Sequence, residues 1–112
     1  MRTNQNQGRL AFTVMWQVRA GKEEAAADII ARFAPEACGE PGLELLMVNR
    51  SATNPSEFLF YKVFRDAAAF EAHQQTRHFK TMILEEALPL LDRRERVQWE
   101  PLTPVSNMIK AR

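Results

Sequence analysis

The stretch Phe58-Leu59-Phe60-Tyr61-Lys62-Val63-Phe64 decides the fold, because it places apolar side chains on both faces of one strand. Successive side chains of a β-strand point to opposite faces of the sheet. One face therefore carries the three phenylalanines, and the other carries Leu59, Tyr61 and Val63. An antiparallel sheet commonly buries one face and leaves the other in water. A strand that is apolar on both sides predicts a sheet whose two faces are both covered by other parts of the protein.

Three further segments show the alternation of apolar and other residues that is typical of a strand. In the last of them Val97 and Trp99 share one face. The loop between the second and third predicted strands contains Asn54-Pro55, which favours a turn, so these two strands form a predicted antiparallel hairpin. The four predicted strands are Leu10 to Arg19, Leu43 to Arg50, Glu57 to Phe64 and Arg94 to Glu100.

Two helical regions separate these strands. Apolar residues recur at helical spacing from Ala26 to Ala37, and Gly39 is expected to end this first helix. Asp66 is a suitable N-cap for the second region, which breaks near Thr76 and is expected to end at Pro89. The element order is βαββαβ, with the second helix split.

This order predicts an α+β fold of the ferredoxin-like type, in which helices pack on one face of a four-stranded antiparallel sheet. The helices can cover only one face, whereas the strand over residues 57–64 is apolar on both. Monomers rarely leave an apolar face of that size exposed. We therefore expect a second copy of the chain to cover the other face, as a homodimer.

Composition excludes several classes of protein. The 112 residues are enough for one domain, and 15 Lys+Arg against 14 Asp+Glu give no field that would attract nucleic acid. No apolar run could span a bilayer and the polar start has no signal-peptide segment, so we expect a cytoplasmic protein without a membrane partner. The single cysteine, Cys38, cannot form an internal disulfide and is expected to be buried.

Four motifs resemble the antibiotic biosynthesis monooxygenase (ABM) family. They are the stretch from Phe58 to Asp66, the run Ala69 to His73, the tripeptide His78-Phe79-Lys80, and the turn Glu40-Pro41-Gly42-Leu43, which is similar to a Glu-Pro-Gly turn in that family. The resemblance covers about residues 10–102, which leaves residues 1–9 as a flexible N-terminal segment and 103–112 as a C-terminal tail. It implies that two ferredoxin-like subunits pair their sheets into a dimeric α/β barrel, each with a pocket between its own sheet and helices.

Within the family, the run from Phe70 to Phe79 is most similar to the small bacterial quinol monooxygenases. The autoinducer-processing isomerases carry a similar histidine-containing helix, so the motif indicates a site better than a reaction. Three functions follow as hypotheses. The first is a cofactor-independent monooxygenase that acts on a small electron-rich aromatic such as a hydroquinone or polyphenol, with dioxygen. The second is an isomerase of a small carbonyl compound, and the third is a ligand-binding barrel without catalysis.

The resemblance implies that His73 is the catalytic base, because an imidazole can take a proton from a phenol near neutral pH. His78 is a second candidate, which could donate a hydrogen bond to the substrate. Either histidine could instead have a purely structural role. The residues expected to form an aromatic, polarisable substrate pocket are Trp16, Met47, Tyr61, Phe70 and Met82.

No cofactor is expected. The sequence has no glycine-rich phosphate loop and no Cys/His cluster at zinc spacing. Its two histidines alone make a metal site unexpected.

Overall fold

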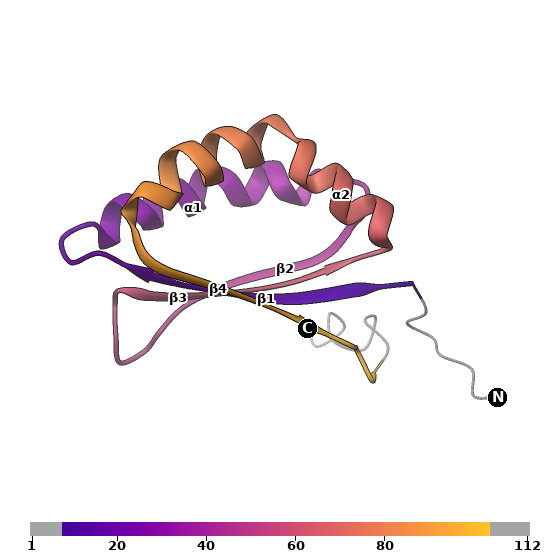
Figure 1. Cartoon of the computed structure of the whole chain (residues 1–112), viewed down its shortest axis with the longest axis horizontal. Coiled ribbons are helices and arrows are strands. Elements are labelled where there is room, and N and C mark those ends of the chain that lie inside the picture. Colours follow the sequence, from indigo (N-terminus) through magenta and orange to yellow (C-terminus); the bar gives the residue numbers. More distant parts are fainter. Residues whose placement is uncertain (1–7, 104–112) are drawn as a thin grey trace.

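The computed structural model describes residues 8–103, in which a four-stranded antiparallel sheet carries its helices on one face (Figure 1). The strand order is β2-β3-β1-β4. This architecture confirms the predicted α+β, ferredoxin-like fold. The strands are β1 (Leu10–Val18), β2 (Leu43–Arg50), β3 (Glu57–Phe64) and β4 (Leu91–Trp99), and the first two helices are α1 (Glu23–Cys38) and α2 (Ala67–Gln75).

The last strand begins three residues before the predicted start at Arg94 and ends one residue early, at Trp99. Its first residue, Leu91, pairs with Val18 of β1, across an irregularity in the register. The polar residues between Leu91 and Arg94 break the alternation that indicates a strand, whereas backbone pairing does not depend on side-chain type. Pairing with β1 therefore extends β4 beyond what alternation predicts.

The second helical region splits as predicted, but its second piece is not α-helical. Asp66 caps α2 by accepting a hydrogen bond from the backbone of Ala69 at 2.8 Å. After a break, a π-helix, η1 (Phe79–Ala87), is followed by a 3-10 turn, η2 (Leu88–Leu90). Every fourth residue of η1 is buried. An apolar stripe at that spacing suits an α-helix as well, so the sequence does not distinguish the two.

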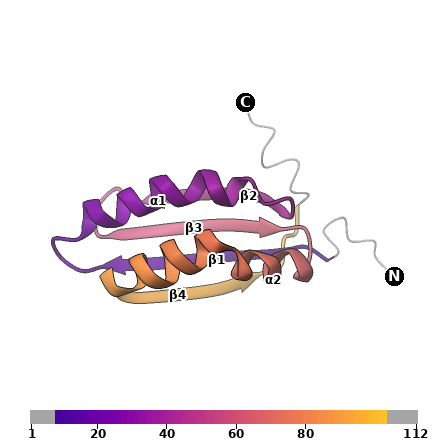
Figure 2. The same cartoon turned by 90° about the horizontal axis from the view of Figure 1, so that it is seen from above.

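The core lies between the sheet and the helices. The register pairs Val14 with Phe60 and Trp16 with Phe58, so these side chains share the face that the helices cover. In Figure 2 α1 lies over the β2 and β3 side of the sheet, while α2 and η1 lie over the β1 and β4 side. We call the helix-covered side of the sheet the inner face and the opposite side the outer face.

The outer face carries large apolar side chains that this chain leaves exposed. The register places Met47 and Leu59 there, together with Val97 and Trp99 of β4, which share a face as predicted. Their exposed fractions range from 38% for Val97 to 53% for Met47. Both faces of the sheet are therefore apolar, as the sequence of β3 predicted.

Cys38 is exposed, and the expectation that it is buried was wrong. Its neighbour Ala37 takes the buried position on α1, and the next residue of a helix is rotated by about 100°. The two predicted end segments fall largely outside the described residues. Within residues 8–103, no helix is both long enough and apolar enough to cross a membrane.

The turn after α1 packs tightly against α2 at Gly42. A Cβ atom built on Gly42 would lie 2.2 Å from the Cβ atom of Ala69, which is far inside contact distance. The carbonyl of Gly42 also accepts a hydrogen bond from the backbone of Arg65 at 2.8 Å. Gly42 therefore allows the turn to approach α2, and that approach also brings Glu40 toward the helix.

We expect Gly42→Ala to destabilise the protein by about 1–3 kcal/mol, the usual range for overpacking. Gly39→Ala is the matched control, because a Cβ atom there meets its nearest neighbour at 3.4 Å and the backbone is already right-handed helical. Urea unfolding of both variants provides the measurement. Equal unfolding midpoints for the two variants would show that the close approach at Gly42 is not required.

Candidate active site

The carboxylate of Glu40 forms hydrogen bonds with both His73 and His78. The Nδ1 atom of His73 lies 2.9 and 3.0 Å from the two carboxylate oxygens of Glu40. The Nε2 atom of His78 lies 2.5 Å from Glu40 Oε2. Since an ionised carboxylate only accepts hydrogen bonds, the N–H group of each of these ring nitrogens donates a hydrogen bond to Glu40. In neutral His73 the unprotonated nitrogen is therefore Nε2.

The break between α2 and η1 brings the two histidines to the same carboxylate. Residues five positions apart on one continuous helix would point about 140° away from each other. Thr76 ends α2 with an extended backbone, and its hydroxyl donates to the carbonyl of His73 at 2.8 Å. Helical structure resumes after Thr76, and His78 immediately precedes η1. The break therefore allows two histidines that are five residues apart in the sequence to contact the same carboxylate.

His73 is enclosed by aromatic rings. Its side chain is 1% exposed, and ring centroids of Phe64, Phe79 and Phe33 lie 5.0, 5.1 and 6.1 Å from its own. Burial, followed by the nearby charge of Lys62, lowers the pKa of His73 below its ordinary value of 6.5, against the opposing effect of Glu40. Its buried Nε2 has no hydrogen-bond partner among the described residues. The lowered pKa favours the neutral imidazole at neutral pH, in which Nε2 is the unprotonated nitrogen.

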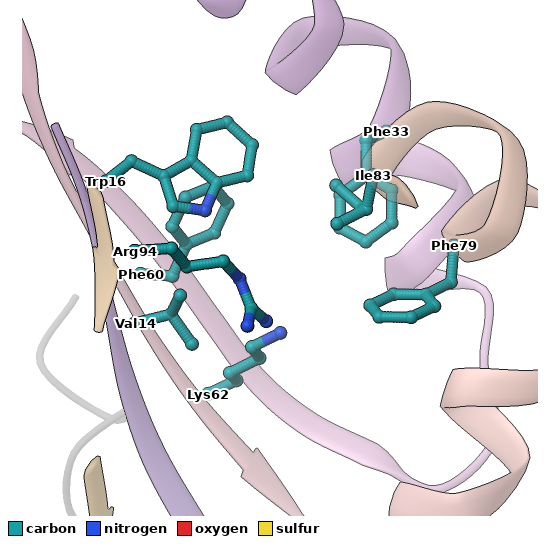
Figure 3. Close-up of a pocket in the computed structure, with 8 residues that line it drawn as sticks. All are labelled: Val14, Trp16, Phe33, Phe60, Lys62, Phe79, Ile83 and Arg94. Atoms are coloured by element: carbon teal, nitrogen blue, oxygen red, sulfur yellow. The ribbon is translucent and has the colours of Figure 1, made fainter. Parts of the chain in front are cut away.

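A narrow pocket lies between the inner face of the sheet and the helices, and His73 is not among the residues that line it (Figure 3). Phe33 and Phe79 contribute both to its wall and to the cage around His73. The pocket is nearly closed, because it leaves only about 10 Å³ for the centre of a water-sized sphere, which is room for about one water molecule. The pocket is lined by Val14, Trp16, Phe33, Phe60, Lys62, Phe79, Ile83 and Arg94.

Two cations project into this aromatic pocket. In Figure 3 the ammonium group of Lys62 and the guanidinium group of Arg94 lie close together on the sheet side. Lys62 is buried, and loss of water, followed by repulsion from Arg94, lowers its pKa to about 8. Arg94 is exposed on the edge strand β4. The pocket therefore has one cation in its interior and one at its rim.

The structure separates the five residues that were expected to line a pocket. Trp16 lines the pocket. Met47 and Tyr61 lie on the outer face, so they cannot contact this pocket. Phe70 stacks on a phenylalanine of β1, and Met82 packs against the core; neither lines the pocket. Residue type indicated an aromatic site, but the register decided which side chains reach it.

Sequence reasoning did not assign a role to Glu40, Lys62 or Arg94. Glu40 was noted only as part of a turn, since nothing in the chain shows that residues 33 and 38 positions away reach it. A signal for Lys62 exists, because it is the one charged residue on an otherwise aromatic side of β3. Arg94 and Arg96 alternate in the same way on β4, opposite the face of Val97.

Glu40, His73 and His78 could also provide ligands to a metal ion. Their ligand atoms lie within 4.8 Å of one another, and two histidines with one carboxylate can bind a divalent metal. In this arrangement, however, the same atoms are hydrogen-bonded to each other, and the charge of Lys62 nearby would oppose a cation. The geometry fits proton transfer by a carboxylate-oriented histidine better than metal binding.

Comparison with solved structures supports the fold. A structure from Nitrosomonas europaea, provisionally named an antibiotic biosynthesis monooxygenase, is 22% identical over 87% of this chain and 93% of its own, with a TM-score of 0.81. One of the same provisional name from Bacteroides thetaiotaomicron is 19% identical over 88% and 94%, with a TM-score of 0.82. A conserved protein from Methanosarcina mazei is 20% identical over 86% and 95%, with a TM-score of 0.78.

Comparison with curated proteins finds no significant match. The sequence profile of the antibiotic biosynthesis monooxygenase family matches residues 10–83, from the start of β1 into η1. That range contains Glu40, His73 and His78, and it makes up more than half of the chain. The protein therefore belongs to the antibiotic biosynthesis monooxygenase family.

Proposed function

We propose that the protein is a cofactor-independent monooxygenase that acts on a small electron-rich aromatic such as a hydroquinone or polyphenol, with dioxygen as the second substrate. The observation that carries this proposal is the Glu40–His73 pair, whose free Nε2 is buried among aromatic rings, two of which, Phe33 and Phe79, also line the aromatic pocket. Membership of a monooxygenase family supports the reaction class.

In the proposed reaction, His73 Nε2 removes a phenolic proton and Glu40 stabilises the imidazolium that results. The phenolate passes one electron to dioxygen, and the two radicals combine to form a carbon–oxygen bond. After proton transfer, the O–O bond of the hydroperoxide breaks. One oxygen atom stays on the ring as a quinone carbonyl, and the other leaves as water with the ring proton. The aromatic wall keeps bulk water from the intermediates.

His73→Ala is expected to reduce turnover of the best hydroquinone substrate by about a hundredfold or more, the usual scale for losing a general base. The base acts in its neutral form, and burial lowers its pKa, so the wild-type rate should rise with pH through a limb centred below about 6.5. The limb should be absent in the variant. Oxygen uptake measured across pH, with thermal unfolding as a check on folding, provides the test.

Glu40→Gln distinguishes a positioned base from an isolated one. Because the charge of Glu40 raises the pKa of His73, removing that charge should move the rising limb of the pH–rate profile to lower pH and should reduce turnover. Gln75→Ala, an exposed change at the end of α2, is the matched control and should leave both unchanged. Full activity of His73→Ala would remove this residue from the mechanism. Product formation without oxygen uptake would favour the isomerase.

We also propose that a second copy of the chain covers the outer face. The exposed apolar side chains there come from three strands, so they form a surface across the sheet and not a single edge. A patch of this kind is usual at a subunit interface and unusual on a monomer. The two active-site pockets would remain on the inner faces, away from the contact.

Leu59→Asp should convert the dimer to a monomer at micromolar concentration, because it buries an unpaired charge in the centre of the proposed interface. Leu84→Asp is the control, since Leu84 is similarly exposed, at 45% against 41%, but lies on η1 away from the outer face. Sedimentation velocity gives the association state of each. A folded wild-type monomer at that concentration would disprove the dimer.

A further inference from the structure

We propose that the ligand of the pocket carries a carboxylate group, which Lys62 and Arg94 bind on the sheet side while the aromatic ring lies among Trp16, Phe60 and Phe79. If the proposed function is right, this ligand is the substrate. The identity of the ligand as a substrate therefore rests on the proposed function, whereas its binding through a carboxylate does not. It specifies a class of substrate, an aromatic hydroxy acid, rather than a neutral hydroquinone.

The position of Lys62 is the first argument. It faces the helices from the interior of β3, between Phe60 and Phe64 and paired with Phe12 of β1, where an apolar residue would complete the core. Its side chain is 7% exposed, and it makes no ion pair with an acidic side chain within residues 8–103. Its ammonium group lies 6.0 Å from the ring centroid of Phe60, but a buried ammonium without an anionic partner is costly. An anionic ligand would supply the missing partner.

Two arginines reinforce the positive charge. Arg94 and Arg96 extend from the inner face of β4, opposite Trp16 and Val14 of β1. Arg96 lies over two phenylalanine rings at 5.4 and 5.3 Å, and its charge contributes to lowering the pKa of Lys62. Arg94 makes no ion pair in the part of the chain that the structure describes, and its guanidinium converges on Lys62 (Figure 3). Two like charges aimed at one point indicate a site for an anion.

Glu40 does not neutralise this cluster. Its charge favours the protonated form of Lys62, but its carboxylate already accepts hydrogen bonds from both histidines. Three charged groups act on the ammonium of Lys62: Glu40 raises its pKa, and the two arginines of β4 lower it. With one negative charge against three positive charges, the site has a positive surplus, which favours an anionic ligand.

The shape of the site favours a carboxylate over a phosphate. The guanidinium of Arg94 is a planar fork that matches the two oxygens of a carboxylate. The remaining wall is aromatic and aliphatic, which suits an aromatic ring once the lining side chains move apart to admit it. The exposed Arg94 at the rim would first attract the anion, and the buried Lys62 would then hold it.

Calorimetric titration without oxygen tests the inference on binding alone. Gentisate, a dihydroxybenzoate, should bind at least about tenfold more tightly than its methyl ester, which has the same ring and hydroxyl groups but no charge. Benzoate should likewise bind more tightly than phenyl phosphate. Equal affinity for gentisate and its ester, or tighter binding of phenyl phosphate, would overturn the carboxylate assignment.

Variants of β4 locate the effect. Arg94→Gln should abolish the preference for gentisate over its ester, whereas Arg93→Gln should keep it, because Arg93 is the adjacent residue of the same strand but faces outward beside Glu95. Lys62→Met should abolish the preference and also raise the melting temperature, since it removes the unpaired buried charge. A retained preference in both Arg94→Gln and Lys62→Met would refute the site.

Oxygen uptake separates this inference from the proposed function. If gentisate shows the predicted preference but no oxygen is consumed, the pocket binds aromatic acids and the monooxygenase proposal fails. If neutral hydroquinones are oxidised with His73-dependent oxygen uptake and the acid group gives no advantage, the monooxygenase proposal stands and the carboxylate inference fails.

Discussion

The geometry of the candidate site depends on the hydrogen bonds that Glu40 accepts from His73 and His78. These bonds tie the turn after α1 to α2 and to the start of η1, and they fix which nitrogen of each ring carries a proton. They leave the Nε2 atom of His73 buried and unpaired. The close approach of Gly42 to α2 and the break at Thr76 are the two features that allow one carboxylate to reach both rings.

The charge of Lys62 sets a limit on stability. Its pKa is about 8 in the folded protein against an ordinary value of 10.5, which corresponds to roughly 3 kcal/mol of unfavourable free energy at neutral pH. Since the folded state binds this proton less tightly, the cost is complete below pH 8 and is relieved as pH rises toward 10.5. A residue that costs this much in the core is more readily explained by ligand binding than by folding.

Strand β3 shows which features of the fold its sequence could predict and which it could not. Its alternation correctly indicated two apolar faces and, with the other strands, the ferredoxin-like order. The same alternation could not say which face the helices cover, and Tyr61 and Met47 were expected in a pocket although they lie on the outer face. Aromatic character alone is shared by both faces, whereas the polar member of the inner face, Lys62, distinguishes them.

The sequence by itself determined the element order, the N-cap at Asp66 and the break near Thr76, because each depends on residues close in the chain. The two histidines became candidates through a family motif. Only the tertiary structure decided that Glu40 accepts hydrogen bonds from both histidines and that Lys62 and Arg94 line the same pocket. These contacts join residues tens of positions apart on different elements. Strand register and helix packing set them, and neither leaves a local pattern in the sequence.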